Sequence, residues 1–245
     1  YKRQILQCLE GYEMSSVARM VLTASGGPFR GQSLEELWEV RPFHALNHPT
    51  WSMGAKISID SATLANKALE VIEAHFLYGM GYDDLGVVVH PQSIVHSFVE
   101  FVDGSVLAQM GFPTMELPIQ YAMAYPERLE DETLRTFDPV RASPLIFEEV
   151  DAETFALFAL GQRAGREAGA SPAVYNAANE VAVEAFLKEH IRFPAMADVV
   201  SHALDVLGGE GAGTLDQVLK VDAEAREVAE AAVVALKQRE SSTIS

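Results

Sequence analysis

Residues 93–110 contain the feature that most narrows the possible folds, an Asp103-Gly104 dipeptide between two apolar stretches. Asp-Gly is one of the preferred two-residue turns of a β-hairpin. The stretch before it alternates, so that one face would carry Ser93, Val95, Ser97, Val99 and Phe101. We predict antiparallel strands over residues 93–102 and 105–110. This ribbon could form a core face or part of an interface.

Two further strands are predicted, over residues 17–24 and 86–90. The first leads into Ser25-Gly-Gly-Pro. Two glycines after a strand permit close approach of the backbone to a ligand, although a plain turn explains them equally well. Ser33 and Glu36 have the spacing of a capping box and predict the start of a short helix.

The pattern changes after residue 125. Residues 126–150 hold three prolines and many charges, and are read as a linker. From residue 151 onward the apolar residues recur with a helical period. The predicted fold class is α/β (α+β): a first domain over 1–125 with a small mixed sheet that includes the antiparallel hairpin, followed by an all-α helical bundle over 151–240.

Helix-start signals divide the second domain. Ser171 followed by Pro172 predicts an N-cap and a first-turn proline. Pro194 predicts the start of the next helix, and Asp222 the start of the last one, through about Arg239.

Residues 48–70 are the most informative stretch for function. They run from a loop with an aromatic residue into a helix for which Asp60 and Ser61 are candidate N-caps. Placing residues at roughly 100° steps puts Asn66, Lys67 and Glu70 on one narrow polar strip.

That strip suits a phosphorylated, oxygen-rich ligand. A helix start offers free N–H groups and a positive dipole end, Lys67 adds a charge, and Asn66 adds directed hydrogen bonds. Glu70 is a hard oxygen donor for Mg²⁺ or Mn²⁺. The alternative is an ordinary solvated helix face, on which Lys67 and Glu70 form an i,i+3 pair.

Charge and composition exclude several classes of partner. The formal net charge is −17 over 245 residues, which disfavours nucleic acid and anionic membranes. No apolar stretch is long enough to predict a membrane span. The single cysteine, Cys8, excludes an intrachain disulfide and fits a reducing compartment, and it is read as a small buried residue rather than a nucleophile.

Long blocks of the sequence resemble 1-deoxy-D-xylulose 5-phosphate reductoisomerase, in the same order and over about residues 17–226. The blocks are Ser25-Gly-Gly-Pro-Phe-Arg30, His48-Pro-Thr-Trp-Ser-Met-Gly54, Lys56-Ile-Ser-Ile-Asp-Ser-Ala-Thr63, Asn66-Lys67 with Glu70, His90-Pro-Gln-Ser-Ile-Val-His96, Asp103-Gly-Ser-Val-Leu-Ala-Gln109 and Asn176-Ala-Ala-Asn-Glu180.

The resemblance implies an enzyme that rearranges 1-deoxy-D-xylulose 5-phosphate and reduces the product with NADPH to 2-C-methyl-D-erythritol 4-phosphate, for non-mevalonate isoprenoid synthesis. It implies a divalent metal (Mg²⁺, Mn²⁺ or Co²⁺), a homodimer and a bacterial-type cytoplasmic location, with a plastid location left open.

The resemblance also assigns residues. Catalytic roles fall on Glu70, His48 and Lys67, with Glu70 as the metal ligand. Substrate contacts fall on Ser25, His48, Trp51, Ser61, Asn66, Lys67, Glu70 and His96, with Trp51 as a lid. The positions beside the cofactor are Met53, Gly54, Pro113 and Met115.

The sequence departs from the family in two respects. It has no Gly-x-Gly-x-x-Gly strand-turn-helix for a dinucleotide. The family's Asp-Ser-Glu segment, which would supply two further metal carboxylates, should precede residue 1. We therefore expect a catalytic plus C-terminal portion that is inactive alone. The alternative is a non-catalytic module, derived from that enzyme, that binds phosphate or dimerises.

Overall fold

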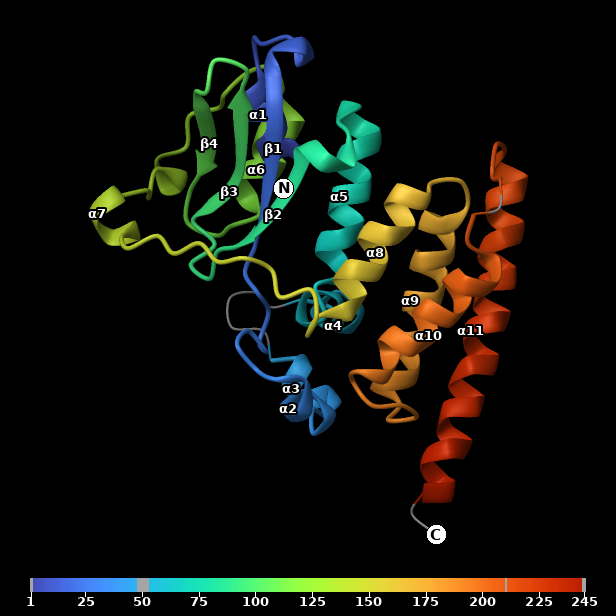
Figure 1. The fold of residues 1–245 in the computed structure, drawn as a ribbon. Helices are drawn as coiled ribbons and strands as arrows, with labels where there is room; N and C mark the ends of the chain where they lie inside the picture. Colours follow the sequence, from blue (N-terminus) through green and yellow to red (C-terminus); the bar gives the residue numbers. More distant parts are fainter. Residues whose placement is uncertain (1, 48–52, 210, 244–245) are drawn as a thin grey trace. The chain divides into compact units, whose positions relative to one another are not determined.

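The computed structural model describes residues 2–47, 53–209 and 211–243, and it divides into two compact units (Figure 1). One comprises Tyr1–Gly26 and Glu73–Val150, and is called the sheet unit below. The other comprises Gly27–Ile72 and Asp151–Ser245, and is called the helical unit.

The sheet unit is built on four strands, β1 (Val17–Ala24), β2 (Leu85–Val89), β3 (Val95–Phe101) and β4 (Val106–Met110). Their spatial order is β2-β1-β3-β4, with β1 parallel to β2 and antiparallel to β3, and β3 antiparallel to β4. The small mixed sheet with its antiparallel hairpin is therefore confirmed. The hairpin register pairs Phe98 with Ala108 and Val99 with Leu107.

Short helices complete this unit. They are α1 (Lys2–Leu9), the later part of α5 (Ala65–Tyr78), α6 (Glu116–Ala124) and α7 (Pro139–Ala142), with 3₁₀ turns at Met14–Ser16, Tyr82–Asp84 and Glu132–Leu134. Residues 126–150, predicted as a linker, belong to this unit, where Glu148 pairs with Val89 at the edge of the sheet. The predicted domain boundaries remain predictions.

The His90 ring fixes the segment around Ile146 to the end of β2. His90 is fully buried, and its Nδ1 lies 2.7 Å from the carbonyl oxygen of Ile146. The Ile94 N–H donates to Nε2 at 3.1 Å, so the neutral tautomer carries its proton on Nδ1. The ring also stacks on Phe147. Both ring nitrogens are thus occupied by backbone groups, which makes His90 a structural histidine.

The helical unit contains the remaining helices, namely α2 (Leu34–Trp38), α3 (Pro42–Ala45), α4 (Ala55–Ala62), the start of α5, α8 (Ala156–Glu167), α9 (Ser171–Leu187), α10 (Ala195–Leu207) and α11 (Leu215–Thr243). Helix α9 is the centre of its core and packs against α8, α10 and α11. Its buried side includes Val174, Tyr175, Ala178, Ala182 and Phe186. The predicted capping box before α2 is present, since Ser33 and Glu36 each bond to the other's backbone N–H.

Three helix starts differ from the prediction. The single helix expected from Asp60 is two helices, because Leu64 adopts a positive φ of 60° between α4 and α5. Asp60 and Ser61 lie in the last turn of α4 and are not N-caps. Ser171 makes no capping bond, and its hydroxyl instead joins Glu167 to the Gly209 N–H.

The last helix begins seven residues before Asp222. Thr214 accepts from the Gln217 N–H at 3.3 Å, and the Gln217 side chain accepts from the Thr214 N–H at 3.1 Å. This reciprocal pair is a capping box, which starts α11 at Leu215. Asp222 lies inside the helix and pairs with Arg226. Within the described residues, no helix combines the length and the apolar character that crossing a membrane requires.

Cys8 is expected to be unreactive in the folded protein. Its side chain is buried, and burial raises the pKa of the thiol, with a hydrogen bond to Ser97 acting in the opposite direction. A raised pKa keeps the nucleophilic thiolate scarce near neutral pH. Burial of the neutral thiol therefore stabilises the fold fully below the unfolded-state pKa of Cys8. This stabilisation is lost as the pH rises through the folded-state pKa.

Labelling by an aromatic disulfide at pH 7.5 should accordingly be slow, and complete only after urea is added. A Cys8→Ser variant serves as the blank. Rapid labelling in native buffer would show that the thiol is accessible.

Candidate functional site

The junction of α4 and α5 forms the candidate site in the helical unit. Thr63 closes α4, Leu64 turns the backbone through the left-handed region, and α5 begins at Ala65. Asn66 and Lys67 therefore lie in the first turn of α5. At this turn the Ala65 N–H donates to Thr63 Oγ1 at 3.4 Å and the Lys67 N–H donates to the Leu64 carbonyl at 3.1 Å, so the positive end of the helix dipole is what the backbone offers to an anion. The predicted association of these two side chains with a helix start holds, although the helix is α5.

Glu70 occupies the centre of this group. One carboxylate oxygen, Oε1, accepts from Asn66 Nδ2 at 2.6 Å, and the other, Oε2, contacts Lys67 Nζ. The exposed fractions are only 4 % for Lys67 and 9 % for Glu70. The pair is buried rather than solvated, which differs from the ordinary polar helix face weighed as the alternative. Burying an ion pair costs desolvation that only good geometry offsets.

Ser61 is held by a close approach of the loop after β1. Gly27 has a φ of +67°, and a Cβ placed there would lie 2.7 Å from the Ser61 carbonyl oxygen and 3.0 Å from Ala62 Cα. Only glycine satisfies both the conformation and the spacing. The second glycine of Ser25-Gly-Gly-Pro therefore packs against the α4 turn that carries Ser61.

A buried network that the sequence analysis did not identify fixes the same turn. Asp60 and Asn179 are both buried, and Asn179 Nδ2 donates to Asp60 Oδ1 at 2.8 Å. Lys56 Nζ approaches Asp60 Oδ2 at 2.6 Å. Burial, with a smaller effect of the Asp60 charge, raises the pKa of Tyr175 well above its ordinary value. Because Asp60 and Asn179 are 119 residues apart, no local pattern could have revealed the contact.

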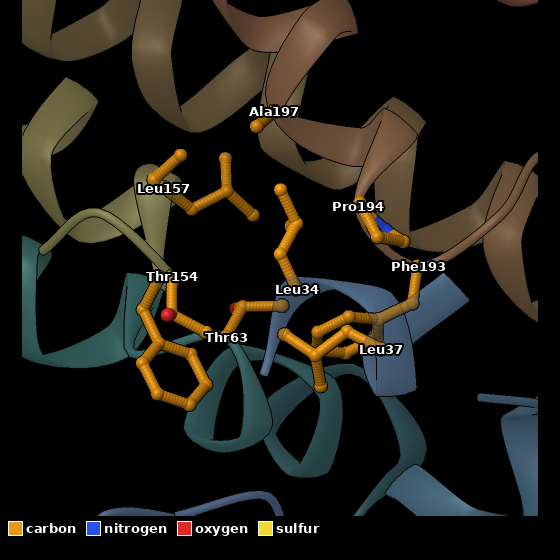
Figure 2. A pocket seen from close by; sticks show the side chains of 10 residues that line it. Leu34, Leu37, Thr63, Thr154, Leu157, Phe193, Pro194 and Ala197 are labelled. Carbon is orange, nitrogen blue, oxygen red and sulfur yellow. The ribbon is translucent and has the colours of Figure 1, made fainter. Parts of the chain in front are cut away.

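The apolar side of the junction is closely packed. Thr63 lines a pocket of about 40 Å³ together with Leu34, Leu37, Leu157, Phe193, Pro194 and Ala197. Figure 2 shows these side chains converging from α2, the α4–α5 junction, α8 and the start of α10. A volume of this size holds about one water molecule, so the pocket is a packing gap and not a substrate site.

Helix α8 approaches α5 closely at Ala68. A Cβ on Gly161 would lie 2.4 Å from Ala68 Cβ and 2.9 Å from Tyr175 Cζ. Gly161→Ala should therefore reduce the free energy of unfolding by about 1–3 kcal/mol, as overpacking does.

Urea denaturation of Gly161→Ala, Ala68→Gly and the double variant would measure this effect. The free energy of unfolding of the double variant should fall by less than the sum of the two single reductions, because Ala68→Gly removes the clashing methyl group. Strict additivity would show that the two positions do not touch.

The other predicted site residues lie in different parts of the chain. His48 and Trp51 lie outside the described residues. Gly54 is the exposed N-cap position of α4, and Met53 precedes it. Ser25, His96, Pro113 and Met115 belong to the sheet unit. Whether these side chains surround one ligand with those of the helical unit stays a prediction.

The described residues do not by themselves fit a divalent metal. Among residues 2–47, 53–209 and 211–243, no three His, Cys, Asp or Glu side chains gather as a metal site requires. Both oxygens of Glu70 are also occupied by Asn66 and Lys67. Mg²⁺ needs several oxygen ligands in near-octahedral geometry. Within the described residues, Glu70 could supply at most one of these ligands.

Two family models match the chain. A model described as the 1-deoxy-D-xylulose 5-phosphate reductoisomerase C-terminal domain matches residues 2–78, and one described as the DXP reductoisomerase C-terminal domain matches residues 110–228.

Curated relatives with the same name agree with these models. The protein from Clostridium botulinum (strain Okra / Type B1) is 53 % identical over 223 residues, which are 91 % of this chain and 58 % of the relative. The protein from Desulforamulus reducens is 50 % identical over 225 residues, 92 % of this chain and 58 % of the relative. The chain thus spans under two thirds of the length of these relatives.

Solved structures are similar over nearly the whole chain. The Zymomonas mobilis reductoisomerase in complex with NADPH has a TM-score of 0.87 and 42 % identity, covering 94 % of this chain and 59 % of that one. A DOX-P reductoisomerase in complex with NADPH, fosmidomycin and magnesium has a TM-score of 0.89 and 39 % identity, covering 96 % and 62 %. Since the two family models together take in most of its length, the chain belongs to the 1-deoxy-D-xylulose 5-phosphate reductoisomerase family.

Proposed function

We propose that this chain contributes the substrate-phosphate site to the NADPH- and divalent-metal-dependent conversion of 1-deoxy-D-xylulose 5-phosphate to 2-C-methyl-D-erythritol 4-phosphate. The proposal rests on the position of Asn66 and Lys67 in the first turn of α5. Ser61 lies just before them in the chain, in the last turn of α4. The positive end of a helix dipole, an ammonium group, an amide and a hydroxyl are all groups that bind a phosphate monoester. A firmly held phosphate would orient the reacting carbons at the other end of the sugar.

The buried pair sets a condition on phosphate binding. Asn66 and Lys67 both point their donors at Glu70, so an incoming phosphate competes with that carboxylate for the same groups. Binding would therefore turn Lys67 and Asn66 toward the ligand and leave Glu70 available to other partners. Glu70→Gln should tighten phosphate binding, because the competing charge is removed while the side chain keeps its size.

Calorimetric titration with 1-deoxy-D-xylulose 5-phosphate and with unphosphorylated 1-deoxy-D-xylulose would test the site. We expect binding of the phosphate ester only. Asn66→Asp should weaken it about tenfold or more, because a carboxylate replaces a donor. Lys188→Met, an exposed pair member on the last turn of α9, is the matched surface control. Equal binding of both sugars, or no effect of Asn66→Asp, would contradict the proposal.

The reductive step is expected to be absent from residues 1–245 alone. The sequence has no Gly-x-Gly-x-x-Gly motif, and the described residues gather no metal cluster. NADPH oxidation by purified 1–245, followed at 340 nm with substrate and Mg²⁺, Mn²⁺ or Co²⁺, should equal the rate without protein. Substrate-dependent oxidation of NADPH would contradict this expectation, but it would not contradict the proposed phosphate site.

We also propose that β4 mediates a homodimer. It is one of the two edge strands of the sheet, and Val106 is 52 % exposed, with Leu107 and Met110 also exposed. An exposed apolar edge invites pairing with a second strand. Light scattering at micromolar concentration should give twice the chain mass, and Leu107→Lys should reduce it to one chain. An unchanged mass for Leu107→Lys would place the interface elsewhere.

A further inference from the structure

A second cavity, which unlike the first has a polar lining, lies in the helical unit between the end of α9 and the start of α3. It measures about 90 Å³, and Val40, Arg41, Phe186, Glu189, Ile191 and Arg192 are among its lining residues. Val40, Phe186 and Ile191 are buried and form a firm apolar wall. Arg41 and Arg192 add two positively charged residues to the lining, and Glu189 adds one negatively charged residue. The cavity thus carries a net positive charge in a chain whose formal net charge is −17.

Arg192 has an unsatisfied donor. Its Nη1 is buried, and no hydrogen-bond acceptor for it exists in the part of the chain that the structure describes. The backbone of Arg192 is fixed on both sides by Ile191 and Phe193, and the Phe193 ring meets those of Phe29 and Phe186 edge to face. The guanidinium is therefore attached to a rigid part of the core. A buried charged donor without a partner is costly, so this position calls for an acceptor.

Glu189 occupies a position that suits glycine better. It follows the end of α9 with a φ of 55°, its N–H donates to the Phe186 carbonyl, and the His190 N–H donates to the Ala185 carbonyl. These two bonds define a Schellman motif, in which a non-glycine residue is strained. A carboxylate also interacts unfavourably with the negative end of the helix dipole. Its partner is Arg41 Nη1 at 3.1 Å, in a pair whose side chains are 42 % and 58 % exposed.

We propose that Arg41 and Arg192 form a binding site for a small oxyanion, with the Glu189 carboxylate as the internal group that it displaces. Guanidinium groups bind phosphate and carboxylate oxygens through paired, charge-assisted hydrogen bonds. The exposed Arg41–Glu189 pair is weak, so Arg41 can exchange partners at little cost. The site is separate from the Asn66–Lys67 group and does not depend on the function proposed above.

Two-dimensional ¹⁵N NMR of residues 1–245 would test this site, since the amide signals of 189–192 and of 65–70 report on the two places separately. Sodium phosphate and sodium acetate are titrated at constant ionic strength against sodium chloride. We expect the 189–192 signals to move saturably with phosphate, acetate or both, and not with chloride. Movement confined to 65–70, or shifts at 189–192 that chloride reproduces, would overturn the proposal.

Matched variants sharpen the assignment. Arg192→Met should weaken the response at 189–192 about tenfold or more, as expected for one lost charge-assisted hydrogen bond. Arg163→Met removes an equal charge from a surface pair with Glu167 and Asp205, and should leave the affinity unchanged. Glu189→Gln alters only an exposed side chain and should tighten binding several-fold, because the competing carboxylate is gone. Weaker or unchanged binding by Glu189→Gln would contradict the displacement.

Discussion

Replacing Lys67 with methionine is expected to reduce the free energy of unfolding by about 3–5 kcal/mol, the usual loss when one member of a buried ion pair is removed. The reason is the burial of Glu70, whose carboxylate would lose the Lys67 ammonium and keep the hydrogen bond from the Asn66 amide. The loss would arise from a stranded charge and not from missing hydrophobic contact, because methionine fills much of the same space.

A double substitution separates these causes. Lys67→Met combined with Glu70→Gln should recover most of the stability, since no unpaired charge remains and the amide oxygen at position 70 can still accept from Asn66. Lys188→Met is the matched control, because Lys188 and Glu184 form a comparable helical pair with exposed fractions of 57 % and 66 %. It should cost less than about 0.5 kcal/mol. Equal losses for Lys67→Met and Lys188→Met in urea denaturation would show that burial of the first pair has no energetic consequence.

Gly27→Ala, the second variant with a large expected effect, should reduce the free energy of unfolding by about 3 kcal/mol. A left-handed conformation costs an L-residue about 1–2 kcal/mol. The added methyl group would also lie 2.7 Å from a backbone oxygen of α4, which cannot move aside as a flexible side chain could, and overpacking adds about 1–3 kcal/mol.

Gly31→Ala provides the comparison. Gly31 has a similar φ of +80°, but a Cβ there would meet nothing within 4 Å. Gly31→Ala should therefore reduce the free energy of unfolding only by the cost of the left-handed conformation, about 1 kcal/mol. The difference in urea midpoint between the two variants measures the contact of Gly27 with the Ser61 turn. Identical urea midpoints would mean that Gly27 makes no close contact with α4.

Local patterns in the sequence were sufficient for the elements whose signals are themselves local. The Asp103-Gly104 turn predicts the β3–β4 hairpin, and the Ser33–Glu36 spacing predicts the start of α2, because each signal satisfies backbone groups within a few residues. Thr214 and Gln217 carry the same kind of signal for α11, and the predicted start at Asp222 was wrong because these two residues cap the helix earlier.

Other features could not be read locally. The break at Leu64 has no glycine or proline to announce it, and leucine ordinarily avoids a positive φ. The Asp60–Asn179 bond depends on α9, which comes about a hundred residues later in the chain, and the burial of Lys67 and Glu70 follows from the folded structure and not from their spacing. Periodicity orders residues around one helix, but it does not say which neighbour will cover them.

The backbone reversal at Leu64 also insulates two groups of side chains from each other. In an uninterrupted helix, one inserted residue rotates everything downstream by about 100°. Here α4 ends at Ala62 and α5 begins at Ala65, so the rotation that relates Asn66, Lys67 and Glu70 to one another does not extend back to Ser61. The direction of the Ser61 hydroxyl relative to the ammonium–carboxylate pair is therefore set by the backbone conformation of Thr63 and Leu64, and not by helical periodicity.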